Sequence, residues 1–255
     1  MAEPLYPREH GAYAQLVFPL LSGLVLGSPG RVSFLFAAAA VMLFLANEPA
    51  ALLLGVRGKR LQLEFAEAAK RALVLRGGLG GIAGLGAFWL APPEARWLAL
   101  VPAAFATGLL PLVLAKRLKT LPGEFIAAAA FASMHLPVAA AGAVAGVLLW
   151  APAAMWLVVT LVTTLCVHAI KSRVTGARPW VGAAAAWSAR VALLAALCVA
   201  ALLPDWRPVA IAALLPLAAA LIVNRLAPSP KRLKQVGWTM VAANALALAL
   251  LTAGS

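Results

Sequence analysis

Blocks of about 20 apolar residues, separated by short charged or proline-rich breaks, run through the whole chain. A block of this length crosses a hydrocarbon core of about 30 Å as a helix. A lipid-exposed backbone must satisfy its own hydrogen bonds, and the Ala- and Leu-rich blocks lack the alternating pattern of a membrane barrel. The sequence therefore predicts an all-α, polytopic transmembrane bundle. The nine predicted spans are residues 11–28, 32–54, 73–91, 97–115, 121–146, 149–170, 182–203, 208–226 and 233–252.

Composition excludes an ordinary water-soluble domain. Of the 255 residues, 64% are hydrophobic and 11% are charged, whereas soluble domains are about 45–50% apolar and about 25% charged. The sequence shows no long linker, internal repeat or second domain. We therefore expect one transmembrane helical domain over residues 1–255.

Basic residues predict the orientation of the chain. With the N-terminus inside, 17 of the 21 Lys and Arg residues lie on the inner side and three on the outer side. This asymmetry follows the positive-inside rule and places the C-terminus outside. The net charge of +13 is then mainly topological and suits contact with anionic membrane lipids. Nucleic-acid binding is not expected, because no soluble domain exists to read a groove.

Asn47 and Glu48 are polar residues inside the second span, followed at once by Pro49. Ionisable groups within a span usually face a partner or a cavity. Pro49 lacks a backbone donor and leaves a carbonyl free near Leu45, which would bend the helix and turn the pair inward. Two interpretations remain open: a pocket on the cytoplasmic side, or an ion pair of Glu48 with Arg57 or Arg8 that locks two helices together.

Two further clusters lie at predicted inner ends. Arg8, Glu9 and His10 open the first span, where Glu9 suits the positive end of the helix dipole. His10 is either a proton carrier or ligand, or a hydrogen-bonded anchor. His168 and Lys171 share a helix face by their spacing and precede Arg173, so they suit a phosphate or carboxylate, or serve as positive-inside anchors.

Other polar residues receive separate interpretations. His135 and Arg190 lie within spans and are candidates for buried partners. Glu124 follows Pro122 and Gly123 at a helix start, where capping explains it. Asn224 and Asn244 are expected to hydrogen-bond between helices. Residues 61–72 are expected to form a short interfacial helix. The two cysteines, Cys166 and Cys198, are expected to be packing residues without metal spacing.

The opening PREHGAYAQLVFPL and the later LFLANEPAALLLGVRGKR resemble the YwiC-like family of bacterial integral membrane proteins. Members of that family open with a basic-x-His-Gly-Ala-aromatic motif. The resemblance implies a multi-pass protein of the bacterial cytoplasmic (inner) membrane, and it implies no particular activity.

A second resemblance is architectural. Nine helices with polar clusters on the second and sixth spans are similar to the UbiA superfamily of intramembrane prenyltransferases, whose Asp-rich motifs there hold Mg²⁺ and a prenyl diphosphate. Here Asp205 is the single aspartate of the chain and lies on the predicted outer side. One carboxylate at Glu48 does not build such a magnesium site. We therefore expect no metal and no cofactor, and cations in their place.

These observations predict a cytoplasm-facing polar and basic cavity that binds an amphiphilic anion such as an isoprenoid or lipid phosphate. A small-solute or proton-coupled transporter using Glu48, His135 and His168 and a non-catalytic membrane assembly factor remain alternatives. The sequence leaves open whether the protein is an enzyme, and it identifies no catalytic residue. The predicted binding residues are Arg8, Glu9, His10, Asn47, Glu48, Arg57, Lys59, Arg60, His168, Lys171 and Arg173.

Overall fold

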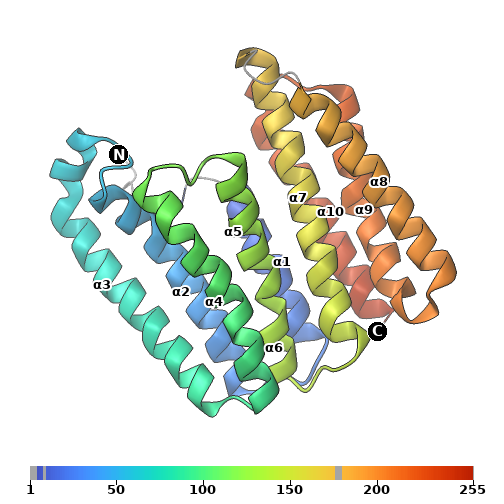
Figure 1. Cartoon of the computed structure of the whole chain (residues 1–255), viewed down its shortest axis with the longest axis horizontal. Coiled ribbons are helices and arrows are strands. Elements are labelled where there is room, and N and C mark those ends of the chain that lie inside the picture. The colour runs from blue at the N-terminus through green and yellow to red at the C-terminus, as the bar shows by residue number, and fades with distance from the viewer. Residues whose placement is uncertain (1–4, 8–9, 176–179, 255) are drawn as a thin grey trace.

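The computed structural model describes the chain except residues 1–4, 8–9, 176–179 and 255 (Figure 1). Within the described residues the regular structure is entirely helical. The α-helices are α1 (His10–Val25), α2 (Arg31–Leu53), α3 (Lys59–Leu90), α4 (Pro93–Leu114), α5 (Leu121–Ser133), α6 (His135–Ala141), α7 (Val147–Thr175), α8 (Trp180–Leu202), α9 (Arg207–Leu226) and α10 (Leu233–Ala253). Two 3₁₀ turns, η1 (Pro204–Trp206) and η2 (Pro230–Arg232), precede α9 and α10.

The predicted fold class is confirmed. Among the described residues, eight segments are long and apolar enough to cross a membrane, and α1 is a shorter apolar helix. Helices α5 and α6 form one such segment, broken between Ser133 and His135. Pro137 explains the break, because it has no N–H to bond the carbonyl of Ser133. The protein is therefore a multi-pass helical membrane protein.

One end of the bundle collects the loops that follow α2, α4 and α9 (Figure 1). We call it the basic end. Its loops and the adjoining helix starts carry Arg57, Lys59, Arg60, Lys116, Arg117, Lys119, Lys231, Arg232 and Lys234. The described part of the chain begins near this end, and the C-terminus lies toward the other (Figure 1). This arrangement is the one that the charge asymmetry requires, and the orientation in a membrane stays a prediction.

Arginines at the opposite end have local roles. Arg96 donates from Nε to the carbonyl of Ala91, the residue after α3, at 2.8 Å and from Nη2 to the Trp89 carbonyl in the last turn of α3 at 2.9 Å. Arg207 donates from Nε to the Ala200 carbonyl at 2.9 Å, near the end of α8. The last carbonyls of a helix lack intrahelical partners and carry partial negative charge. These two cations therefore satisfy helix C-termini.

Helix α3 corrects one prediction. Residues 61–72 do not form a separate interfacial helix but the first turns of a 32-residue helix. No Pro or Gly interrupts the chain between Gly58 and Gly77, so nothing ends the helix there. Farther along, a Cβ placed on Gly80 would lie 2.9 Å from Leu43 Cγ of α2. The glycine therefore lets α2 and α3 pack closely, as small residues do in membranes.

The two largest buried apolar clusters among the described residues form most of the core. The larger joins α7, α8, α9 and α10 around Trp156, Leu217 and Leu251, and the second joins α1, α2 and α6 around Leu16 and Phe36. Of the two free cysteines, Cys166 is buried and packs in the larger cluster, whereas Cys198 is exposed. The packing role predicted for the cysteines thus holds for Cys166 and is wrong for Cys198.

Candidate functional site

Glu48 is a buried acid, 6% exposed, near the end of α2. Arg57 donates to it from Nε to Oε2 at 3.0 Å and from Nη2 to Oε1. Gly55 and Gly58 adopt positive φ angles of 68° and 98°, a conformation that glycine adopts without strain. The loop can therefore turn back, and Arg57 reaches the carboxylate on the helix that it has just left. Of the two partners considered for Glu48, Arg57 is the one observed, while Arg8 lies outside the described residues.

Arg76 of α3 completes this cluster, although the sequence interpretation counted it only as a topological cation. Its Nη1 donates to the Leu45 carbonyl at 3.1 Å and to the Leu5 carbonyl at 2.7 Å. The Leu45 carbonyl is the one that Pro49 leaves without an intrahelical donor. Arg76 Cζ also lies 4.2 Å from the ring centre of Tyr6. The sequence predicted the free Leu45 carbonyl from Pro49 but did not identify its donor. That donor is Arg76, near the inner end of the next span.

Tyr13 brings α1 to the same place. Its ring meets Phe44 edge-on, with 5.1 Å between ring centres. It lies within electrostatic range of Arg76, Glu48 and Tyr6. We call Tyr6, Tyr13, Glu48, Arg57 and Arg76 the Glu48 cluster.

The other residues predicted around the Glu48 cluster are less enclosed. Asn47 is half-buried, one residue before Glu48, and Lys59 and Arg60 are exposed at the start of α3. His10 begins α1, but its side chain is outside the described part of the structure, as are Arg8 and Glu9. The cluster therefore has a buried ion pair with exposed cations beside it.

A second acid–base pair joins α5 to α7. His168 Nε2 lies 2.8 Å from Glu124 Oε2, and their side chains are 16% and 29% exposed. One turn before His168, Thr164 accepts a hydrogen bond from Gln15 Nε2 of α1 at 3.4 Å. We call these four residues the His168 cluster. Glu124 was interpreted as a capping residue, and the structure gives it this interhelical partner.

Arg173 bonds away from His168. Its Nη2 donates to the Asn224 carbonyl at 3.0 Å and to Asn224 Oδ1 at 3.2 Å. The interhelical role predicted for Asn224 is thus confirmed, whereas Asn244 Oδ1 is buried without a partner among the described residues. Lys171 is exposed. The inner end of α7 therefore contacts α5 and α9 through separate residues.

The predicted site residues that the structure describes fall into separate groups. The Tyr13 ring of α1 contacts Phe44 of α2, whereas Gln15 of the same helix bonds Thr164 of α7. Among the described residues, no hydrogen bond or ion pair joins Glu48 or Arg57 to His168 or Glu124. In the same part of the chain, no three His, Cys, Asp or Glu side chains gather to hold a metal ion.

His135 is fully buried and bonded through both ring nitrogens. Its Nε2 donates to the Leu148 carbonyl at 3.1 Å, and its Nδ1 lies 2.9 Å from Ser22 Oγ. Trp156 Nε1 donates to the same Ser22 oxygen at 2.9 Å. The buried partner expected for His135 is therefore Ser22, and the group ties α1, α6 and α7 together.

Arg190 corrects another prediction. We expected a buried partner, but the side chain is exposed on α8, and its Cζ lies 5.7 Å from the exposed Trp187 ring. Helix α8 lies at the edge of the bundle (Figure 1), and its face from Trp187 to Leu194 points outward. The sequence gives the depth of this arginine along the helix but not the direction in which it points.

Comparison with known proteins gives one match. A model of a family described as YwiC-like protein matches residues 6–139. No curated protein sequence and no solved structure matches the chain. The matched segment ends within α6, so it includes the Glu48 cluster and Glu124 but not His168.

Proposed function

We propose that this chain, which belongs to the YwiC-like protein family, binds the anionic headgroup of an amphiphile at its basic end. The ligand class is an isoprenoid or lipid phosphate. In this proposal the protein lies in the bacterial cytoplasmic membrane with the basic end toward the cytoplasm. The headgroup then approaches from the inner leaflet.

The proposal rests on one observation: two hydrogen bonds to Glu48 fix the orientation of the Arg57 guanidinium. Buried Glu48 engages its Nε and Nη2, which leaves Nη1 for another acceptor. The Arg57 side chain is 30% exposed, and Lys59 and Arg60 are exposed beside it. A guanidinium that is already oriented loses little entropy on binding and suits phosphate oxygens.

Cations bind the phosphate directly in this proposal. Glu48 is paired with Arg57, and we assign it the role of holding that cation. We assign the headgroup contacts to Arg57, Lys59 and Arg60. Arg173 is bonded to Asn224, so we do not assign it a headgroup contact. We assign exposed Lys171 only a secondary contribution to attracting the anionic headgroup.

The test is lipid retention by the purified protein. We expect native mass spectrometry to detect dioleoyl phosphatidic acid on the wild type in preference to dioleoyl phosphatidylcholine. The double variant Lys59→Ala/Arg60→Ala should weaken that binding about tenfold, or about 1.4 kcal/mol. The matched control is Lys231→Ala/Lys234→Ala, which removes the same charge from η2 and the start of α10, also at the basic end. Equal loss in both variants, or no preference in the wild type, would overturn the proposal.

A second candidate, proton transfer, is favoured by a polar stripe on α7. His168, Thr164 and Thr160 follow one another at four-residue spacing, and both threonines are buried. One turn farther, Trp156 joins the Ser22 and His135 group. In proteoliposomes with a pH-sensitive dye, wild type should dissipate an imposed proton gradient and Glu124→Gln should not. A gradient that persists equally in both rejects this candidate.

A further inference from the structure

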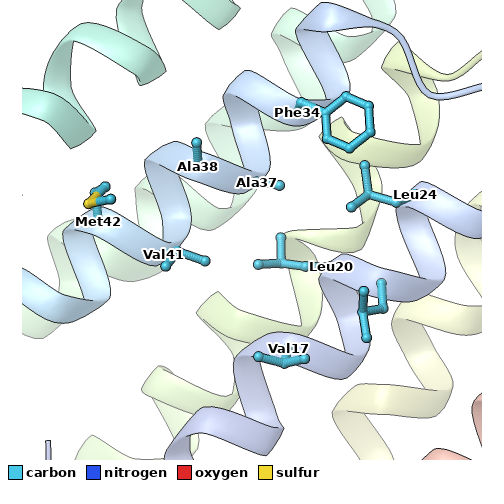
Figure 2. Close-up of a pocket in the computed structure, with 9 residues that line it drawn as sticks. Val17, Leu20, Leu24, Phe34, Ala37, Ala38, Val41 and Met42 are labelled. Atoms are coloured by element: carbon cyan, nitrogen blue, oxygen red, sulfur yellow. The ribbon is translucent and has the colours of Figure 1, made fainter.

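An apolar groove runs between α1 and α2 (Figure 2). Its volume is about 460 Å³. Figure 2 shows side chains of both helices around it, with the small Ala37 and Ala38 among larger residues. The lining residues are Val17, Leu20, Leu21 and Leu24 of α1, and Phe34, Ala37, Ala38, Val41 and Met42 of α2.

The groove and the Glu48 cluster lie on the same faces of the same two helices. On α1, Tyr13 precedes Val17 by four residues, and on α2, Glu48 follows Val41 by seven. Residues at these spacings share one helix face. The apolar groove therefore ends about two turns, or about 10 Å, before Glu48 along α2, on the side toward the basic end.

The length of this surface matches one leaflet. From Tyr13 to Leu24 the helix rises about 16 Å at about 1.5 Å per residue. This is roughly half of a hydrocarbon core of about 30 Å. A single chain of an ordinary membrane lipid therefore fits beside α1 when its headgroup lies at the Glu48 cluster.

We infer that this groove holds the hydrocarbon chain of the same amphiphile whose headgroup binds at Arg57, Lys59 and Arg60. The inference rests on the proposed function. Charge complementarity identifies the occupant. The groove is lined by apolar residues of α1 and α2, and exposed Lys59 and Arg60 follow Arg57 after the end of α2, so an anionic lipid combines both properties. The ligand then enters sideways from the bilayer.

Both parts should contribute to the binding of a long-chain lipid. Lipid tails are as apolar as the groove, so no hydrophobic driving force separates a bound chain from the bulk bilayer. The groove contributes van der Waals contact, which is small for each atom pair and adds up along a chain. The cations anchor the headgroup. A lipid bound in this way should depend on both, unlike a lipid that merely covers the protein surface.

The experiment varies the groove, the headgroup site and the lipid chain separately. Ala37→Trp and, as a milder change, Ala38→Leu place side-chain volume in the groove. The probes are dioleoyl and dihexanoyl phosphatidic acid, measured by native mass spectrometry. The control, Ala104→Trp, adds the same bulk at an exposed position of α4.

We expect Ala37→Trp to weaken binding of the dioleoyl lipid about tenfold and to leave the dihexanoyl lipid nearly unchanged, with Ala38→Leu giving a smaller effect in the same direction. Lys59→Ala/Arg60→Ala should weaken both lipids. If only the headgroup variant loses lipid, the groove inference fails and the proposed function stands. If neither Ala37→Trp nor Lys59→Ala/Arg60→Ala differs from Ala104→Trp, the groove inference and the proposed function both fail. The retained lipid then binds nonspecifically to the protein surface.

Discussion

The two acid–base pairs of the molecule, Glu48 with Arg57 and Glu124 with His168, are built differently. Glu48 is bonded by a residue nine positions later, across the tight loop that ends α2. Glu124 is bonded by a residue 44 positions away, on a different part of the bundle. The first carboxylate is buried, whereas the second is more than a quarter exposed.

The Glu48–Arg57 pair therefore stabilises the local turn after α2, whereas the Glu124–His168 pair joins two helices that are far apart in the sequence. Arg57 supplies the counter-charge of the buried acid. The Glu124 pair connects α5, within the family-matched segment, to α7 beyond it. Removing Arg57 leaves the buried Glu48 carboxylate without a counter-charge. Removing His168 leaves Glu124, which is partly exposed. The two pairs should therefore respond very differently to mutation.

Arg57→Ala should have the largest effect on stability. Removing one partner of a buried pair typically costs about 3–5 kcal/mol, because the remaining charge is uncompensated. We expect that loss in the free energy of unfolding, measured in detergent with a chemical denaturant. Lys59→Ala is the control and should change the free energy by less than about 0.5 kcal/mol. Glu48→Leu/Arg57→Leu should recover most of the stability, and no recovery would contradict the interpretation of a stranded charge.

Arg76→Leu should come next, with a loss of about 1.5–3 kcal/mol, the range for hydrogen bonds to charged groups. The reason is that the Leu45 carbonyl loses the donor that replaces the missing N–H of Pro49. In a Pro49→Ala background, the backbone N–H returns and Arg76→Leu should cost measurably less. Denaturation of the four proteins of this double-mutant cycle measures the difference. Equal costs in both backgrounds would show that the carbonyl is not the contact that matters.

His168→Ala should have a smaller effect, and its coupling to Glu124→Gln should be about 0.6 kcal/mol, the average for interhelical hydrogen bonds measured in a membrane protein. A double-mutant cycle on unfolding free energies provides the measurement. A coupling above about 2 kcal/mol would make this pair equal to the buried one and remove the contrast between them.

Arg190→Leu should have the smallest effect in purified protein. The side chain is exposed, and its contact with the Trp187 ring is worth about 0.5–1 kcal/mol at an exposed site. We expect the free energy of unfolding in detergent to change by no more than that. A larger loss would indicate a contact of Arg190 beyond Trp187.

The sequence predicted the spans and the positions of polar residues along them, but not the directions in which their side chains point. Apolar block length sets where helices run, so the predicted spans correspond to the observed helices apart from the break before His135 and the inclusion of residues 61–72 in α3. The pairing of Glu48 with Arg57 was accessible because the two residues are nine positions apart, one near the end of α2 and the other in the loop that follows it. Glu124 and Arg190 were misinterpreted because a helix's rotation depends on which neighbours it packs against. That information is absent from one linear sequence.

The bond from Arg76 to the Leu45 carbonyl also bears on how the protein is made. A nascent α2 that entered the bilayer alone would carry an unsatisfied carbonyl and an unpaired Glu48, and its counterparts are synthesised later, at Arg57 and Arg76. Each such group is costly in hydrocarbon. Helix α2 should therefore leave the translocon together with α3, as a hairpin, and a ribosome stalled before Arg76 should leave α2 accessible to aqueous reagents.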